Sequence, residues 1–397
     1  MDTLKELYKI GCGPSSSHTM GPQRASEKFL KRNKNAKEFK VTLYGSLAAT
    51  GKGHLTDYII EKTFYPRKIN VIFREDIVKK FHPNGMLFEA LDENEKVIDT
   101  YMVYSIGGGS LKEEDEKIKK IDDYYNLKSM NDIIEWCKNN NKNYINYILE
   151  NEDSEIMNYI QIIKKTMENS IQEGLEREDT IPGKLNLKRR AKKFYEKYKE
   201  SKQLSTLIYS YALAVSEQNA SGYDIVTAPT CGSAGVVPGV LIAFKDFYKI
   251  QDNKIEEALL VGGLVGNLIK NNASISGAEV GCQGEIGAAC SMAAAAIAYL
   301  KGGNLSQIEY AAEIGLEHHL GMTCDPVYGY VQIPCIERNA MGAQRALDAA
   351  NYALLTDGSH YISFDQCVLT MKETGIDLHD NYKETAKGGL AKHFFTC

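Results

Sequence analysis

The pattern of hydrophobic and polar residues divides the chain into a mixed first part and a helical remainder. Short β-like runs stand at VTLYGS (from 41), KINVIFRE (from 68), MLFEALDEN (from 86) and YMVYSIGGG (from 101). Their β-branched and aromatic residues are typical of a pleated surface. A helix is expected from about Pro22, where proline takes a first helical position after a glycine turn. Residues 1–112 are therefore predicted to form a small N-terminal α/β domain.

The rest of the chain is predicted to be mostly helical. Residues 113–180 carry Ile, Leu and Tyr at helical spacing, with a break at KNNNKN (138–143), and we interpret them as a helical linker region. Residues 181–397 are predicted to form an α-helical domain, in which the small residues of 261–300 let helices approach closely. The segment SQIEYAAEIGLEHHLG places these residues on one stripe, as in a helix packed on a core: Ile308, Ala311, Ala312, Gly315, Leu316 and His319. The predicted fold class is α+β.

Length, composition and charge narrow the possible partners. At about 150 residues per domain, 397 residues predict two or three domains. A net charge of -5 argues against nucleic acid as a partner, and the basic run KLNLKRRAKK (184–193) is interpreted as a solvated helix face. The first residues lack an apolar run, and AACSMAAAAIAYL (288–300) is shorter than the ~20 residues of a membrane span. We therefore expect a cytoplasmic protein without a membrane partner, whose nine cysteines are reduced thiols or metal ligands.

Three cysteines are candidate metal ligands. Cys282, Cys324 and Cys335 stand beside glycine or proline, or one residue from an acid, where turns carry a thiolate out of a helix end. Their spacings of 42 and 11 residues fit no zinc ribbon or finger. Three thiolates would leave one iron of a four-iron cluster without a protein ligand, and such an iron is a Lewis acid. The alternative is that they are buried, reduced core thiols.

The loop IGCGPSSSHTMGPQRAS (10–26) is a candidate anion-binding site. Ser15, Ser16, Ser17 and Thr19 offer hydroxyls and turn amides before a helix start, an arrangement that can hold a carboxylate or phosphate. His18 stands among them. The alternative is a serine-rich surface turn with a helix cap. The glycine-rich GSLAATGKGH (45–54) lacks the spacing of a phosphate loop, so no nucleotide is implied.

Cys231, in APTCGSAGVVPG, is a candidate catalytic nucleophile. A helix start after it would lower the pKa of the thiol and make it a possible nucleophile. No serine nucleophile elbow accompanies it and no histidine lies near it in sequence. A turn that binds substrate through amides and hydroxyls is the favoured interpretation.

Four motifs in one order resemble the bacterial iron-sulfur L-serine dehydratases, the L-serine ammonia-lyases. They are GPSSSHTMGP, APTCGSAG, SGAEVGCQGEIGAACSMAAA and EHHLGMTCDPVYGYVQIPCIERNA, and the resemblance covers nearly the whole chain. It implies a first domain carrying the SSSH loop, fused to an α-helical iron-sulfur catalytic domain. It further implies that Cys282, Cys324 and Cys335 hold a 4Fe-4S cluster, with Cys231 and Cys290 as neighbours only. Between residues 51–54 and 82 the chain is shorter than expected for single-chain members, which puts a regulatory serine site in the first domain in doubt.

The implied reaction turns L-serine, the small-molecule partner, into pyruvate and ammonia. It needs a base for the Cα proton and help for a poor leaving group, and an open iron stabilises the developing charge. His18 is expected to act on substrate as the base, or to orient the carboxylate together with the three serines. Two alternatives remain: a thiol-nucleophile enzyme centred on Cys231, and a noncatalytic iron-sulfur or redox-sensing protein.

The C-terminal Cys397 is a further candidate ligand. Its thiol and free α-carboxylate imitate the hydroxyl and carboxylate of serine, and thiolate is the softer ligand for iron. Gly388 and Gly389 would act as a hinge, and Phe394 and Phe395 would dock the tail, so that Cys397 occupies the open iron at rest. The alternative is a frayed chain end. A homodimer is expected from the small-residue helices and the habit of the resembled family.

Overall fold

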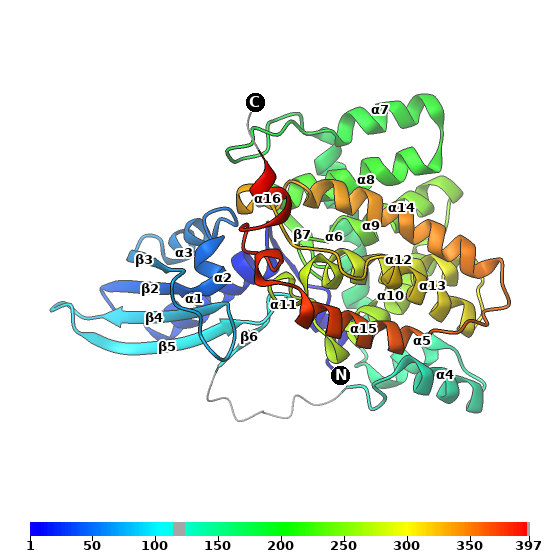
Figure 1. Cartoon of the computed structure of the whole chain (residues 1–397), viewed down its shortest axis with the longest axis horizontal. Coiled ribbons are helices and arrows are strands. Elements are labelled where there is room, and N and C mark those ends of the chain that lie inside the picture. The colour runs from blue at the N-terminus through cyan, green and yellow to red at the C-terminus, as the bar shows by residue number, and fades with distance from the viewer. Residues whose placement is uncertain (114–123, 395–397) are drawn as a thin grey trace.

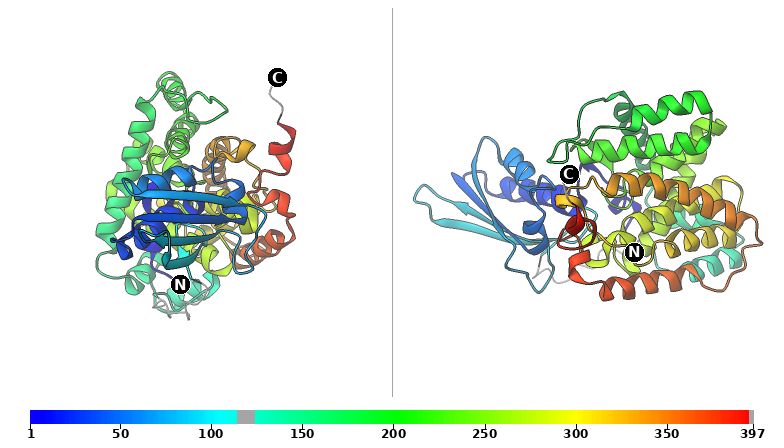
Figure 2. Two further views of the ribbon diagram at one scale, coloured as in Figure 1. Left: turned by 90° about the vertical axis from the view of Figure 1, so that its left-hand side faces the viewer. Right: turned by 45° about the horizontal axis from the view of Figure 1, so that its top comes forward.

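The computed structural model describes residues 1–113 and 124–394, and it contains two domains side by side (Figure 1). The smaller domain is built on one sheet, and the larger one is almost entirely helical. The predicted α+β class is confirmed. The segment between His379 and the C-terminal end of the described chain crosses the junction of the two domains, as the views in Figures 1 and 2 show.

The sheet of the first domain has the strand order β3-β2-β4-β5-β6, with β2 and β3 parallel and the other pairs antiparallel. All four predicted β-like runs are strands. Helices α1 and α3 cover one face, where Phe29, Phe39, Phe64, Phe88 and Tyr101 form a buried aromatic cluster. The elements are β2 (Glu38–Tyr44), β3 (Lys68–Arg74), β4 (Gly85–Leu91), β5 (Val97–Ser105), β6 (Leu111–Lys112), α1 (Gly21–Arg32), α2 (Gly45–Ala49) and α3 (Thr56–Phe64).

The helical domain is organised around α12 (Ile286–Leu300), whose residues from Ile286 to Ala298 are all buried. Its alanines leave little bulk between helices, as the sequence predicted. The predicted stripe on α13 (Leu305–Glu317) is also buried. The other helices are α4 (Met130–Asn139), α5 (Tyr144–Asn151), α6 (Ile156–Glu176), α7 (Ala191–Ser201), α8 (Leu204–Ala220), α9 (Val236–Tyr248), α10 (Asp252–Asn272), α11 (Gly277–Val280), α14 (Cys335–Leu354), α15 (Phe364–Asp377) and α16 (Gly389–His393).

The helices expected to link two domains share the core of the helical domain. Ile133, Ile148, Ile160 and Ile163, from α4, α5 and α6, are all buried in it. The predicted break at 138–143 lies between the end of α4 and the start of α5. The domain limits at 112 and 180 stay a prediction, but helical periodicity alone did not indicate that these segments belong to one core.

The first residues of the chain also pack on the helical domain. Leu4 and Tyr8 are fully buried in its core, and the Tyr8 hydroxyl donates to the carbonyl of Leu259 at 2.9 Å. Strand β1 (Ile10–Cys12), preceded by the short helix η1 (Leu4–Glu6), pairs antiparallel with β7 (Asp224–Val226). The loop that follows β1 is therefore anchored to the larger domain before the chain enters the smaller one.

Within the described ranges, no single helix combines the length and the apolar character that a membrane span requires. One bent pair, Gly277–Gly284 followed by Ile286–Leu300, meets that requirement only when its two pieces are counted together.

Candidate active site

The three predicted ligand cysteines come together from three different segments. Cys282 lies in the short helix η3 (Gly281–Gly284), Cys324 in the loop after α13, and Cys335 is the first residue of α14. All three are buried. The sulfur atoms of Cys282 and Cys324 and a carboxylate oxygen of Glu285 lie within 4.8 Å of one another. The Cys335 thiol is close enough to Cys282 to interact with it electrostatically.

The electrostatics of these thiols calls for a cation. A hydrogen bond with Cys282, together with burial, holds the pKa of the Cys324 thiol well above its usual range. Burial and the nearby Cys282 do the same for the pKa of Cys335. Thiolates crowded in this way are stable only beside positive charge, and Arg338 supplies part of it. The donor set therefore fits a cationic metal centre held by sulfur.

The backbone leaves space beside the sulfur atoms. A Cβ on Gly277 would stand 3.3 Å from Cys324 Sγ and 3.1 Å from Glu285 Oε2. A side chain at residue 277 would occupy the space beside the thiols that a bound metal centre would need. Burial, with a contribution from Glu384, raises the pKa of Glu285 to about 8. These residues fit a three-cysteine iron-sulfur centre with one side left open.

Cys231 and Cys290 do not join this group. Cys290 is fully buried within α12. Cys231 Sγ contacts the sulfur of Met20 at 3.3 Å, and burial holds the pKa of this thiol well above its usual range. A buried, protonated thiol is a poor nucleophile. The structure therefore gives the Cys231 alternative no support.

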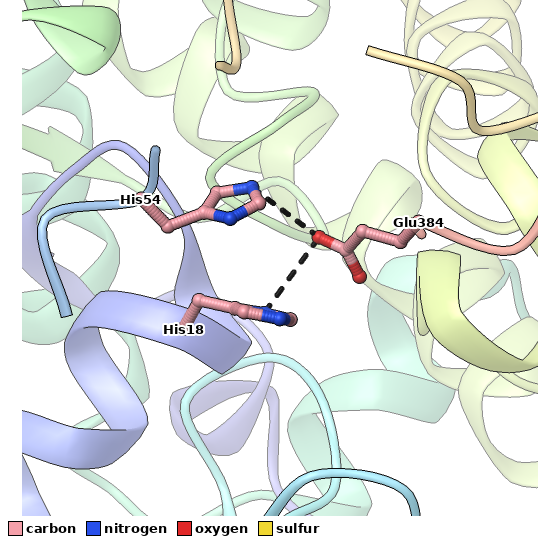
Figure 3. A group of neighbouring side chains, drawn as sticks. All are labelled: His18, His54 and Glu384. Atoms are coloured by element: carbon pink, nitrogen blue, oxygen red, sulfur yellow. Dashed lines mark ion pairs between the residues drawn. The ribbon is translucent and has the colours of Figure 1, made fainter. Parts of the chain in front are cut away.

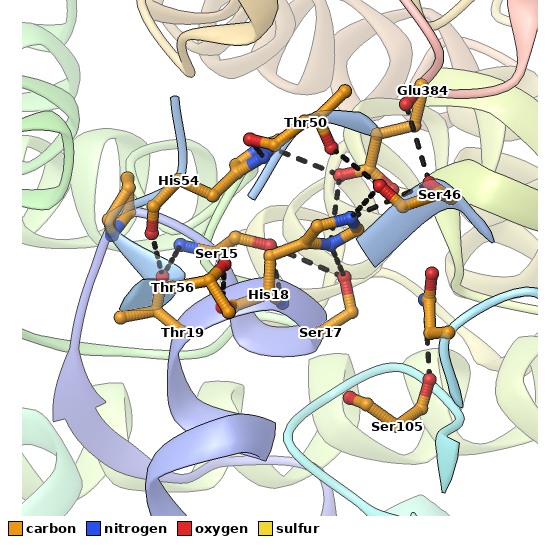
Figure 4. Close-up of polar contacts among 12 residues, drawn as sticks. Ser15, Ser17, His18, Thr19, Ser46, Thr50, His54, Thr56, Ser105 and Glu384 are labelled. Atoms are coloured by element: carbon orange, nitrogen blue, oxygen red, sulfur yellow. Dashed lines mark hydrogen bonds and ion pairs between the residues drawn. The ribbon is translucent and has the colours of Figure 1, made fainter. Parts of the chain in front are cut away.

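The serine-rich loop forms one turn of π-helix, η2 (Ser16–Met20), that runs directly into α1 (Figure 4). The Ser15 hydroxyl caps this turn by accepting the backbone N–H of His18 at 3.1 Å. Ser16 and Ser17 are buried, and Ser17 Oγ lies 3.3 Å from Ser15 Oγ. The loop is an internal element rather than a surface turn, and it fixes the histidine in its centre.

Hydrogen bonds fix which nitrogen of His18 carries the proton. Nε2 lies 3.2 Å from the carbonyl oxygen of Ser46, which can only accept, so Nε2 is the protonated nitrogen. Nδ1 holds the lone pair and accepts the hydroxyl of Ser17 at 2.8 Å. Burial, with the neighbouring His54, holds the pKa of His18 well below its usual range. His18 is thus a neutral imidazole, as a general base must be.

Two residues that the sequence analysis did not select complete the site. Glu384 Oε1 lies 3.7 Å from His18 Nδ1 and 3.6 Å from His54 Nε2 (Figure 3). The two imidazole rings lie 4.5 Å apart, centre to centre. Burial, with a contribution from Cys282, raises the pKa of Glu384 to about 8, so this carboxylate needs a cation beside it to be ionised at neutral pH.

Glu384 reaches the site from a segment that we call the C-terminal strap, residues 378–394. The strap pairs with the loop that carries Cys324: the amide of Cys324 donates to the carbonyl of Tyr382 at 2.8 Å, and the amide of Glu384 donates to the carbonyl of Cys324 at 2.9 Å. Further along, the amide of Leu390 donates to Asp325 Oδ2 at 2.8 Å. The position of Glu384 is therefore tied to the backbone around a ligand cysteine.

Gly389, expected to act as a hinge, is instead a docking point of the strap. It has a φ of +55°, and a Cβ there would stand 2.0 Å from Asp325 Oδ2. Phe394 packs edge-on against Tyr328 with the ring centres 5.6 Å apart, in line with the expected docking of the tail. Phe395 and Cys397 lie outside the described residues, so the predicted ligand role of Cys397 stays a prediction.

The substitution Gly389→Ala should loosen the strap. An alanine at this φ, pressed against Asp325, costs more than ~1 kcal/mol, so amide hydrogen exchange at Glu384 and Leu390 should accelerate by roughly fivefold or more. Gly302→Ala is the matched control, because Gly302 also has a positive φ but no atom within 4 Å of its added Cβ. Unchanged exchange in the Gly389 variant would contradict this docking role.

A cavity opens beside the site. It has a volume of about 750 Å³ and is lined by Ser46, Glu279 and Lys383, among others. The hydroxyl of Ser46 lies 3.5 Å from His18 Nε2, and Lys383 directly precedes Glu384. A small polar molecule in this cavity would therefore contact Ser46, which lies against His18, and Lys383, the neighbour of Glu384 in the chain.

Comparison with known proteins relates both parts of the chain to serine dehydratases. Residues 3–63 match the family described as the serine dehydratase beta chain, and residues 84–391 match the serine dehydratase alpha chain. The chain is 40% identical over 449 positions to an L-serine dehydratase of Streptomyces coelicolor, covering 99% of each protein. It is 38% identical over 449 positions to an L-serine dehydratase of Haemophilus influenzae, covering 98% of this chain and 99% of that one. Since these alignments are longer than the chain, the relatives contain segments that it lacks.

Proposed function

The chain belongs to the serine dehydratase family, and from this premise we propose that it converts L-serine into pyruvate and ammonia. The observation that carries the proposal is the juxtaposition of two groups. Three buried cysteines converge on one side of Glu384, and a neutral, hydrogen-bonded histidine lies on its other side. Elimination of water from serine needs an electrophile for the hydroxyl and a base for the Cα proton, and the site has a place for each.

We assign the electrophile to a 4Fe-4S cluster held by Cys282, Cys324 and Cys335. When bound, its iron without a cysteine ligand supplies a Lewis acid for the substrate's oxygens, a contribution of several kcal/mol in comparable sites. The cysteines anchor the group, and Arg338 offsets part of their negative charge. Gly277 keeps the space beside Cys324 free of a side chain.

The base is His18, and its environment favours that role. The Ser46 carbonyl fixes the proton on Nε2, so the Cα proton is transferred to Nδ1 after the Ser17 hydroxyl turns from that nitrogen toward the substrate. The C–O bond then breaks, and the leaving hydroxyl takes up the proton that His18 received, so that one water is released and the imidazole is neutral again. The remaining aminoacrylate tautomerises to an imine, which water hydrolyses to pyruvate and ammonia.

Anaerobic purification tests the proposal and its alternatives. We expect a brown protein that contains iron and sulfide and forms pyruvate from L-serine, with loss of both colour and turnover in air. Iron without pyruvate formation would instead favour a noncatalytic iron-sulfur protein. In the same assay Cys231→Ala should keep turnover within about threefold of wild type, since buried Cys231 contributes packing alone. Turnover lost with Cys231 while the iron stays bound would favour the thiol enzyme.

A further inference from the structure

His54 and Glu384 bring two unsatisfied polar atoms together in a buried place. His54 Nδ1 lies 3.0 Å from the carbonyl of Thr50, so the ring proton is on Nδ1 and the lone pair is on Nε2. Among the described residues, neither His54 Nε2 nor Glu384 Oε2 has a hydrogen-bond partner. His54 Nε2 faces Glu384 Oε1 at 3.6 Å, a separation too long for a hydrogen bond between them.

The protein itself supplies no cation for this pair. In the part of the chain that the structure describes, the ion pairs of Glu384 are with His18 and His54 only, and both rings are neutral. The neighbouring Lys383 points away and donates to the carbonyl of Ile376. A ligand that carries both positive charge and N–H groups would satisfy His54 Nε2 and Glu384 together.

We propose that Glu384 and His54 are the receptor for the α-ammonium group of the amino-acid substrate, an inference that rests on the proposed function. An ammonium has three N–H donors and no acceptor, which is the complement of the His54 lone pair and the Glu384 carboxylate that forms beside a cation. Its nitrogen can lie about 2.9 Å from both His54 Nε2 and Glu384 Oε1, because these atoms are 3.6 Å apart. Glu384 Oε2 is then free to take a further N–H.

A metal ion fits this place less well. Three protein ligands are the usual minimum for a transition metal at a catalytic site. A metal ion here would need His18 Nδ1 as its third ligand, and the proposed function uses that nitrogen as the base. An ammonium needs only His54 and Glu384.

The position of the receptor also suits the reaction. A Cβ on Gly277 would stand 3.5 Å from Glu384 Oε2 and 3.3 Å from Cys324 Sγ, so the carboxylate borders the cysteine cluster. On its other side Glu384 Oε1 borders His18. A serine held here by its ammonium lies between the cysteines and the base. A hydroxy acid of the same shape has a single O–H donor and no positive charge, so it would leave one of the two residues unpaired and Glu384 without a cation, which gives the site its preference for amino acids.

The test compares L-serine with L-glycerate, in which a hydroxyl replaces the ammonium, on anaerobically prepared holoenzyme. The KM for L-serine and the inhibition constant of L-glycerate are measured for wild type and for Glu384→Gln. Because the lost partner is a buried charge, the variant should bind L-serine roughly 30-fold or more weakly. Its affinity for L-glycerate should change less than about threefold. Glu384→Asp keeps the charge and should restore part of the preference for L-serine.

Glu373→Gln, on the exposed face of α15, is the matched control and should leave both constants unchanged. Iron content and the visible spectrum verify that each variant holds its cluster. Equal weakening of both ligands in Glu384→Gln, or no weakening of either, overturns the ammonium receptor while the proposed function stands. Should Glu384→Gln lose its iron, His54→Ala measures the same ratio from the other half of the receptor. A wild-type holoenzyme that neither binds nor converts L-serine refutes the proposed function, and the receptor with it.

Discussion

Alanine in place of Cys282, Cys324 or Cys335 is expected to abolish bound iron and serine turnover together. In the proposed cluster each thiolate would be the sole protein ligand of one iron, so two remaining cysteines would leave the cluster held at two corners and exposed to loss. The three residues come from η3, a loop and the start of α14, and no other described cysteine joins the group. The measurement is iron and sulfide per chain after anaerobic reconstitution, with pyruvate formation on the same samples.

Cys137→Ala and Cys367→Ala are the controls. Both cysteines are buried in the helical core on α4 and α15, so these variants test the loss of a core thiol without the loss of a ligand. They should keep full iron and near-normal turnover. Any one of the three ligand variants that kept both would remove that cysteine from the assignment.

The substitution His18→Ala should lower kcat roughly a hundredfold or more, the usual contribution of a general base, while the cluster spectrum stays intact. The backbone N–H that Ser15 accepts remains in the alanine variant, so the π-helical turn keeps its cap. What is lost is the lone pair at Nδ1 beside Ser17 and Glu384. Steady-state rates of pyruvate formation and the visible spectrum, measured on one preparation, separate these effects.

His318→Ala serves as the comparison for this variant, because its ring is exposed on the surface at the end of α13. It should turn over serine at the wild-type rate. Normal turnover in His18→Ala would remove His18 from the mechanism. Loss of the cluster in that variant would mean that His18 supports the metal site rather than the proton transfer.

Local patterns in the sequence predicted most of the fold. β-branched and aromatic residues indicated the strands of the first domain, and helical spacing indicated α13 and the break before α5, because these signals depend on near neighbours in the chain. The pairing of β1 with β7 joins residues more than 200 positions apart. Such a contact leaves no periodic trace in a three-residue strand, so the packing of the first residues on the helical domain was not predicted. The expected homodimer stays a prediction.

Some residues of the candidate site could also be predicted from local sequence patterns, and others could not. Glycine and proline mark the turns around Cys282, Cys324 and Cys335, and the serine cluster marks His18, so these residues could be selected. Glu384 stands in NYKETAKGG, a polar segment that reads as a solvated tail, and His54 follows a glycine turn that lacks any phosphate-loop spacing. Their role depends on a tertiary contact between opposite ends of the chain. The one local signal was Gly388–Gly389, which we interpreted as a hinge.

The strap that carries Glu384 is also translated late in the chain. All three ligand cysteines are translated before it, and at about 5 to 20 residues per second Glu384 follows Cys335 by roughly 2 to 10 s. During that interval the cysteines have no strap over them, because the residues that pair with Cys324 and Asp325 do not yet exist. The order of synthesis thus provides a window in which the proposed cluster can be delivered to an open site, and synthesis of the strap closes it.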